Sequence, residues 1–223
     1  MTGDTRLVGR GDHLVYRWQP AAEPDSVPAI LLHGHTGDET VMWVVTKALP
    51  TKGMIVAPRG LYLASEGGYS WTQAIHPGRG TLADLAPSVH ALNTLVDQLE
   101  REAELDRTRM ILVGFSQGAA LAFAAAGDDR LRPQGIVALA GFLPEGAQTR
   151  LSGMPVYWGH GTQDARIPIE EARGDVERLW AAGARVQMCE ADVGHRVGVE
   201  CMRGLHQWWE AHFSQSLHCD VGQ

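Results

Sequence analysis

Ser116 lies at the centre of Gly114-Phe115-Ser116-Gln117-Gly118, between the apolar run 110–113 and the alanine-rich run 119–126. This order predicts a strand, a sharp turn and a helix, with the serine hydroxyl at the apex of the turn. The two glycines omit the side chains that such a tight turn would crowd. A serine held above the end of a strand can attack an acyl carbon, and the amide of Gln117 can face the resulting oxyanion. The segment therefore predicts nucleophilic acyl chemistry.

The chemistry of an activated serine requires two further side chains. Because a serine hydroxyl is a weak nucleophile, it needs a histidine to accept its proton and a carboxylate to fix the tautomer of that histidine. Asp164 follows the apolar run 155–158, and His195 follows the run 185–190. The order serine, acid, histidine, with each residue after a strand, is typical of α/β-hydrolases. The sequence therefore predicts Ser116 as nucleophile, His195 as base and Asp164 as acid.

Two other residues compete for these roles. His160 precedes the acid position, so it is the weaker candidate for the base and can equally line the site or cap a strand end. Asp192 lies three residues before His195 and can reach it, but Asp164 is favoured because its loop follows a strand of the sheet. The sequence leaves both alternatives open. Solvated or structural roles are expected for His206, His212 and His218.

A second oxyanion donor is expected in the loop 33–38, which directly follows a buried strand. Gly34 allows the backbone to turn toward Ser116, which would aim the amide of His35 at the site. The amide of Thr36 is the alternative donor. The simpler interpretation is an ordinary glycine-rich turn between a strand and a helix, and the presence of Ser116 favours the functional interpretation.

Substrate contacts are expected from the loops that follow the strands. Trp43 follows the loop 33–38, Arg59 follows the strand 54–57, and Phe142 follows the strand 135–140. Trp71 lies in the glycine-rich segment 61–80, which could fold over the site. Each residue also has an interpretation as part of the core or of a solvated loop. Arg59 is a cation that could hold a carboxylate or phosphate on the substrate, although arginines at strand ends often bond to loops instead.

The elements that position these residues alternate along the chain. Apolar runs predict buried strands, and amphipathic patterns predict helices between them. Such an alternation predicts a mostly parallel central sheet with helices on both faces, the α/β-hydrolase fold, as a single domain over residues 1–223 with a flexible tail at 213–223. The segment 61–80 has no clear periodicity. A half-exposed edge strand is expected at 13–18, further strands at 29–32, 54–57, 110–113, 135–140, 155–158 and 185–190, and helices at 38–49, 82–105, 168–182 and 199–212.

Composition excludes several classes of function. The 223 residues carry a net charge of −7, which argues against nucleic acid as a partner because phosphate binding needs a basic surface. No apolar run approaches the length of a membrane span, and the N-terminus lacks the hydrophobic segment of a signal peptide. The three cysteines, Cys189, Cys201 and Cys219, lack metal-binding spacing, so free thiols in a reducing compartment are expected. A cytoplasmic location follows from these expectations.

Taken together, the motifs resemble those of the phospholipase/carboxylesterase family, which includes small bacterial carboxylesterases and acyl-protein thioesterases. The resemblance covers about residues 28–212, and the size and layout are also similar to dienelactone hydrolases. Two segments depart from the family pattern, His35-Thr36-Gly37-Asp38 and residues 58–80. The motifs that carry the resemblance to the family are His33-Gly34-His35, Gly114-Phe115-Ser116-Gln117-Gly118, Ala140-Gly141-Phe142-Leu143-Pro144, Gly159-His160-Gly161 through Asp164 to Pro168, and Gly194-His195.

This resemblance implies a serine hydrolase of carboxylic esters or thioesters that needs no metal and no cofactor. It implies Ser116, His195 and Asp164 as catalytic residues and the amides of His35 and Gln117 as oxyanion donors. A small-molecule ester or thioester would be the substrate of a monomer or homodimer. An acyltransferase, a lactone hydrolase or a pathway-specific thioesterase would use the same residues, and a binding protein without turnover is a further alternative.

Overall fold

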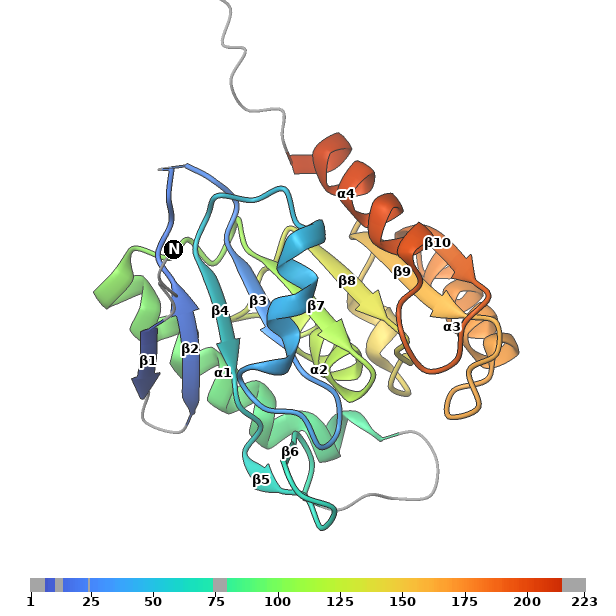
Figure 1. The fold of residues 1–223 in the computed structure, drawn as a ribbon, viewed down its shortest axis with the longest axis horizontal. Helices are drawn as coiled ribbons and strands as arrows, with labels where there is room; N and C mark the ends of the chain where they lie inside the picture. The colour runs from blue at the N-terminus through green and yellow to red at the C-terminus, as the bar shows by residue number, and fades with distance from the viewer. Residues whose placement is uncertain (1–6, 11–13, 24, 74–79, 214–223) are drawn as a thin grey trace, which may run out of the picture.

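The computed structural model describes residues 7–10, 14–23, 25–73 and 80–213. Its main sheet has the strand order β1-β2-β4-β3-β7-β8-β9-β10 (Figure 1). The pairs β1–β2 and β2–β4 are antiparallel, and every other pair is parallel. The strands are β1 (Leu7–Arg10), β2 (Val15–Gln19), β3 (Ala29–Leu32), β4 (Ile55–Pro58), β7 (Ile111–Phe115), β8 (Gly135–Leu139), β9 (Pro155–Gly161) and β10 (Arg185–Ala191).

Helices cover both faces of this sheet because its central strands are apolar on both sides. In β3, Ile30 and Leu32 belong to one hydrophobic core, whereas Ala29 and Leu31 belong to the other. The first core contains side chains of α1 (Leu82–Ala103), α2 (Gln117–Ala126) and α3 (Ile169–Ala181). The second contains side chains of the 3₁₀ helix η1 (Val41–Ala48) and of α4 (Val199–Phe213). The predicted α/β-hydrolase fold is confirmed.

Three local predictions differ from the structure. The segment 38–49 forms the 3₁₀ helix η1 instead of an amphipathic α-helix, with Met42, Trp43 and Val45 buried. The segment 61–80, which showed no periodicity, contains the two-residue strands β5 (Tyr62–Leu63) and β6 (Tyr69–Ser70), paired antiparallel. Strand β2 is not at the edge of the sheet, because β1 pairs with its outer side. Strands of two residues are too short to show an alternating pattern.

The expectation of free thiols is wrong for two of the three cysteines. Cys189 in β10 and Cys201 in α4 form a disulfide, with their Cα atoms 5.5 Å apart, and Cys219 lies outside the described residues. Their separation of 12 residues follows no motif, so only the packing of α4 against the sheet brings them together. The expectation of a reducing compartment rested on free cysteines and loses that support. None of the described helices has the length and apolar character needed to cross a membrane.

Candidate active site

Ser116 lies at a sharp turn between β7 and α2. Its backbone angles are φ 53° and ψ −117°, a combination that a residue with a side chain adopts only when its surroundings impose it. The Ser116 N–H donates to the carbonyl of Leu139 at 2.9 Å, which ties the turn to β8. A Cβ atom on Gly114 would lie 2.3 Å from the carbonyl oxygen of Gly118, so no side chain fits there. These contacts hold the serine hydroxyl at the carboxyl edge of the sheet.

The three predicted catalytic side chains form one hydrogen-bonded chain. Ser116 Oγ lies 3.0 Å from His195 Nε2, and His195 Nδ1 lies 2.7 Å from Asp164 Oδ2. An ionised carboxylate only accepts hydrogen bonds, so the proton of the neutral ring is on Nδ1. His195 Nε2 then has a free lone pair that accepts the serine proton. This geometry is what a serine nucleophile with its base and acid requires.

The Asp164 carboxylate is buried and held from two sides. Its Oδ1 accepts the N–H groups of Arg166 at 2.9 Å and Ile167 at 3.0 Å, while Oδ2 faces His195. Burial by itself raises the pKa of this carboxyl, but the hydrogen bonds from Ile167, His195 and Arg166 outweigh burial and leave the pKa below its ordinary value. Asp164 is therefore ionised at neutral pH and can stabilise an imidazolium.

The two competing residues lie elsewhere in the hydrogen-bond network. Asp192 is exposed, and its carboxylate accepts a hydrogen bond from the side chain of Gln163. Among the described residues, no hydrogen bond joins Asp192 to His195. His160 is buried, and its ring bonds to Trp158 and to the carbonyl of Ile167 instead of to the serine. The geometry favours Asp164 and His195 in the roles that the chain order predicts.

The loop after β3 runs beside the serine. A Cβ atom on Gly34 would lie 3.3 Å from Ser116 Cβ and 2.9 Å from the Phe115 ring, so a side chain here would require the Phe115 ring to shift. The Thr36 N–H already donates to the carbonyl of Tyr69 at 2.9 Å. By contrast, the backbone amides of His35 and Gln117 donate no hydrogen bond to another described residue. The pair His35 and Gln117 is thus the better candidate for the oxyanion hole, and the loop 33–38 that carries His35 is called the oxyanion loop.

The side chain of His33 stabilises this loop through two hydrogen bonds, a role that its sequence motif did not indicate. Its Nδ1–H donates to the carbonyl of Gly34 at 2.7 Å, and its Nε2 accepts the N–H of Gly60 at 2.8 Å. The ring is fully buried, and this burial lowers its pKa despite the nearby Gly34 carbonyl and carboxylates. His33 therefore stays neutral and fixes the start of the oxyanion loop against the segment after β4.

The side chain of Gln117 holds the segment around β6. Its Oε1 accepts the backbone N–H of Trp71 at 3.0 Å, and its Nε2 donates to Thr72 Oγ1 at 3.0 Å. The Trp71 ring, 0% exposed, packs 4.8 Å from the His33 ring, and its Nε1–H donates to the His33 carbonyl at 2.8 Å. Trp71 is thus a packing residue under the oxyanion loop and is not open to a substrate.

Arg59 is engaged by two protein groups. Its Nε and Nη2 donate to the two carboxylate oxygens of Glu39, each at 2.6 Å, and its Nη1 donates to Tyr69 Oη at 3.1 Å. The hydrogen bonds from Arg59 are the main reason that the pKa of Glu39 is lowered. In this arrangement Arg59 ties the end of β4 to the β5–β6 hairpin, and its bidentate face is not free for a substrate carboxylate.

The remaining two pocket candidates differ in exposure. Trp43 is buried in the second core, and its Nε1–H donates to the carbonyl of Glu39 at 2.9 Å, so it does not line an open pocket. Phe142 is partly buried and packs against the first core. An aromatic residue that the pocket prediction did not include, Phe115, lies closer to the chemistry, with its ring centre 5.1 Å from that of His195.

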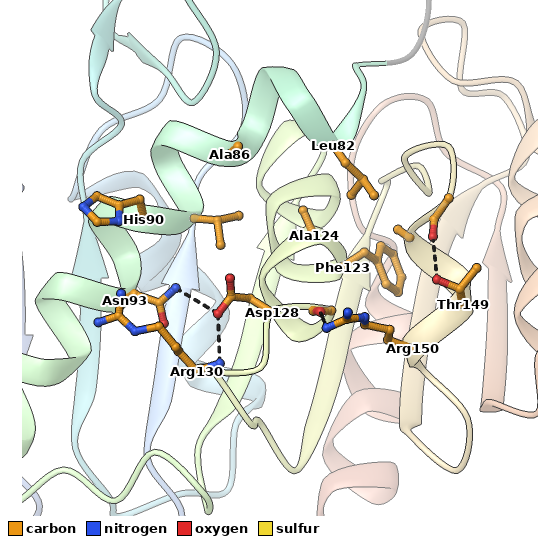
Figure 2. A pocket seen from close by; sticks show the side chains of 14 residues that line it. Leu82, Ala86, His90, Asn93, Phe123, Ala124, Asp128, Arg130, Thr149 and Arg150 are labelled. Atoms are coloured by element: carbon orange, nitrogen blue, oxygen red, sulfur yellow. Dashed lines mark hydrogen bonds between the residues drawn. The ribbon is translucent and has the colours of Figure 1, made fainter.

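A separate cavity of about 360 Å³ lies at the C-terminal end of α2 (Figure 2). It opens between α1, α2 and the short 3₁₀ helix η2 (Ala147–Arg150). Phe123 and Leu82 form part of its apolar wall, and on its polar side Asn93 Nδ2 donates to Asp128 Oδ1 at 3.3 Å. None of the predicted site residues lines it, so this cavity is distinct from the serine site.

In the described part of the chain, no cluster of three or more His, Cys, Asp or Glu side chains is placed to hold a metal ion.

Comparison with known proteins identifies the family. Residues 19–213 match the family described as phospholipase/carboxylesterase. The chain belongs to the phospholipase/carboxylesterase family. Membership places it among α/β-hydrolases of the carboxylesterase and thioesterase type.

Relatives of the family resemble the chain at different levels. Acyl-protein thioesterase 1 of Kluyveromyces lactis is 30% identical over 150 residues, a match that covers 63% of this chain and 64% of the yeast protein. The carboxylesterase of Bacillus cereus superposes with a TM-score of 0.82 at 22% identity and covers 91% of this chain and 96% of its own. The carboxylesterase of Mesorhizobium loti gives a TM-score of 0.80 at 21% identity, with coverages of 92% and 98%. At such identities the two structures show that the fold is shared.

Proposed function

We propose that the protein is a serine hydrolase that cleaves carboxylic esters, thioesters included, through an acyl-enzyme intermediate. The observation that carries the proposal is the hydrogen-bonded chain from Ser116 through His195 to Asp164, with contacts of 3.0 and 2.7 Å. Family membership supports the same reaction class. The yeast relative, an acyl-protein thioesterase, supports the inclusion of thioesters.

In the proposed first step, His195 Nε2 takes the proton of Ser116 as Oγ attacks the acyl carbon. The charge on the carbonyl oxygen is stabilised by the amides of His35 and Gln117, and Asp164 stabilises the imidazolium through His195 Nδ1–H. His195 then gives its proton to the leaving alkoxide or thiolate, which produces the alcohol or thiol and the acyl-enzyme.

The second half of the cycle repeats these roles with water. His195 removes a proton from a water molecule, whose oxygen attacks the acyl carbon, and the same two amides bind the oxyanion. Collapse of this intermediate breaks the bond to Ser116 Oγ, which regains its proton from His195. The acid product leaves, and the starting protonation state is restored.

The test compares four proteins on a short p-nitrophenyl ester. Ser116→Ala should lower kcat by at least about 10³-fold, and Asp164→Asn should also slow turnover severely because it favours the wrong tautomer of the histidine. Asp192→Asn is the matched control, because Asp192 is an exposed carboxylate close in sequence to His195, and it should keep most of the activity. Labelling by a fluorophosphonate probe should be lost in Ser116→Ala and retained in Asp192→Asn.

Either of two results would refute the assignment. Substantial ester hydrolysis by Ser116→Ala would show that Ser116 is not the nucleophile. A crippled Asp192→Asn beside a nearly normal Asp164→Asn would transfer the acid role to Asp192.

A further inference from the structure

His160 is a buried histidine at the carboxyl end of β9 that the proposed mechanism does not use. Its side chain is 0% exposed. Trp158 Nε1–H donates to His160 Nδ1 at 3.3 Å. An indole N–H is only a donor, so Nδ1 carries a lone pair and the proton of the neutral ring is on Nε2. The structure therefore fixes the tautomer of His160 without reference to the serine.

The Nε2–H group of His160 points at the turn that carries Asp164. It donates to the carbonyl of Ile167 at 2.9 Å and lies 3.5 Å from Asp164 Oδ2. The N–H of the same Ile167 donates to Asp164 Oδ1 at 3.0 Å. Ile167 is thus held at its carbonyl by His160 and holds Asp164 with its amide. A short path of two hydrogen bonds connects His160 to the carboxylate.

We infer that His160 is a positioning residue, which holds the 164–167 turn so that Asp164 Oδ2 faces His195. The inference rests on the proposed function, because Asp164 matters only if His195 is the base. His160 itself does not reach the reacting atoms, since its one N–H is committed to Ile167. A misplacement of the carboxylate by a fraction of an ångström would slow the reaction without changing ground-state binding of the ester.

Two carboxylates lie beside the His160 ring. Asp164 is one of them, and Glu190, its partner in the β9–β10 register, is another. Arg173 compensates Glu190 through two hydrogen bonds at 2.8 and 2.6 Å. The contact of Asp164 Oδ2 with His195 is the shorter one, 2.7 Å against 3.5 Å to His160 Nε2, whose hydrogen bond goes to Ile167.

Two substitutions separate the two hydrogen bonds of His160. His160→Gln keeps a side-chain N–H near the position of Nε2, so it can still donate to Ile167. His160→Asn is too short to reach Ile167 but still offers an acceptor to Trp158. His160→Asn should lower kcat about tenfold with KM within about twofold, whereas His160→Gln should stay within about threefold of the wild type. Equal losses in both variants, or no loss in His160→Asn, would overturn the inference.

A double-mutant cycle tests whether His160 acts through Asp164. In an Asp164→Asn background, His160→Asn should slow the residual reaction by less than about twofold, because the group that it positions has already lost its charge. The rate of labelling by a fluorophosphonate probe is measured alongside kcat, so the cycle remains readable at low turnover. A tenfold loss in both backgrounds would show a general structural role and overturn the inference.

One control isolates the effect of losing a histidine-to-carbonyl hydrogen bond. His212 Nδ1 bonds to the carbonyl of Trp208 at 2.8 Å near the end of α4, away from the serine. His212→Asn should leave kcat unchanged. The serine variant separates the two levels of inference: an active Ser116→Ala would refute the proposed function, whereas an inactive Ser116→Ala with a normal His160→Asn would refute only the role of His160.

Discussion

Gly118 is the second residue of α2, a position where helix propensity alone favours alanine over glycine by about 1 kcal/mol. The structure reverses this preference. A Cβ atom on Gly118 would lie 2.1 Å from the carbonyl oxygen of Leu32 and 2.6 Å from that of His33. The strand that leads to the oxyanion loop and the helix that follows Ser116 are therefore in contact at this glycine.

We expect Gly118→Ala to lower the free energy of unfolding by at least about 2 kcal/mol, because a backbone atom must move to admit the methyl group. Gly174 in α3 is the matched control, since nothing lies within 4 Å of a Cβ atom built there. Gly174→Ala should raise stability by about 0.5–1 kcal/mol. Urea unfolding of the two variants checks both signs, and a stabilised Gly118→Ala would contradict the contact.

At the scale of the elements, the disulfide joins β10 to α4 on either side of the loop that carries His195. Cys189 is partly buried in the strand, and Cys201 is fully buried in the first turn of the helix. A cross-link over 12 residues restricts the unfolded chain, so it stabilises the native state.

Reduction of this disulfide should lower the free energy of unfolding by about 3 kcal/mol, the value expected for a loop of this size. The measurement is urea unfolding with and without a thiol reductant. The double variant Cys189→Ser/Cys201→Ser should have the stability of the reduced wild type in both conditions and show no response to the reductant. An equal response of the variant and the wild type would assign the effect to other groups.

The elements also show how far the sequence alone leads. The helix expected at 82–105 is present as α1 (Leu82–Ala103), because 22 residues give a repeated apolar face. The 3₁₀ helix η1 is an α-helix in the sequence-based prediction, because over eight residues the apolar patterns of a 3₁₀ helix and an α-helix hardly differ. The sequence predicted that Ser116, Asp164 and His195 lie close together, because each follows a strand and the carboxyl ends of parallel strands lie at one edge of the sheet.

The supporting contacts of the site were not predictable in the same way. Arg59 pairs with Glu39 across 20 residues, and Gln117 bonds to Trp71 across 46. Such pairs follow no periodicity, because they depend on how one loop packs against another. For this reason the sequence could name Arg59 and Trp71 as residues near the site but not distinguish packing from substrate contact.

At the scale of the whole molecule, the net charge of −7 creates a field that repels anions. Near the serine, the cation of Arg59 is compensated by Glu39, and Glu66 adds an exposed carboxylate within 3.4 Å of the His35 ring. At the loop 33–38 these groups leave no net positive charge that would offset the overall field for an anionic ester.

We expect kcat/KM for an anionic ester such as p-nitrophenyl hemisuccinate to rise about two- to threefold between low and physiological ionic strength, since salt screens the repulsion. Neutral p-nitrophenyl acetate is the control and should change little. A fall in kcat/KM with salt would contradict this expectation. It would point to a cation that binds the substrate, and Arg59 would then be the residue to substitute.

The disulfide has one more consequence, which concerns the connectivity of the molecule. The bond between Cys189 and Cys201 makes residues 189–201 a closed covalent ring, with the rest of the chain attached at two points. A single cut anywhere between residues 190 and 200 would open this ring but leave one connected molecule, with α4 still anchored to the sheet. New chain ends can therefore be introduced beside His195 without releasing the C-terminal helix. This loop is thus a suitable position for the termini of a circularly permuted protein.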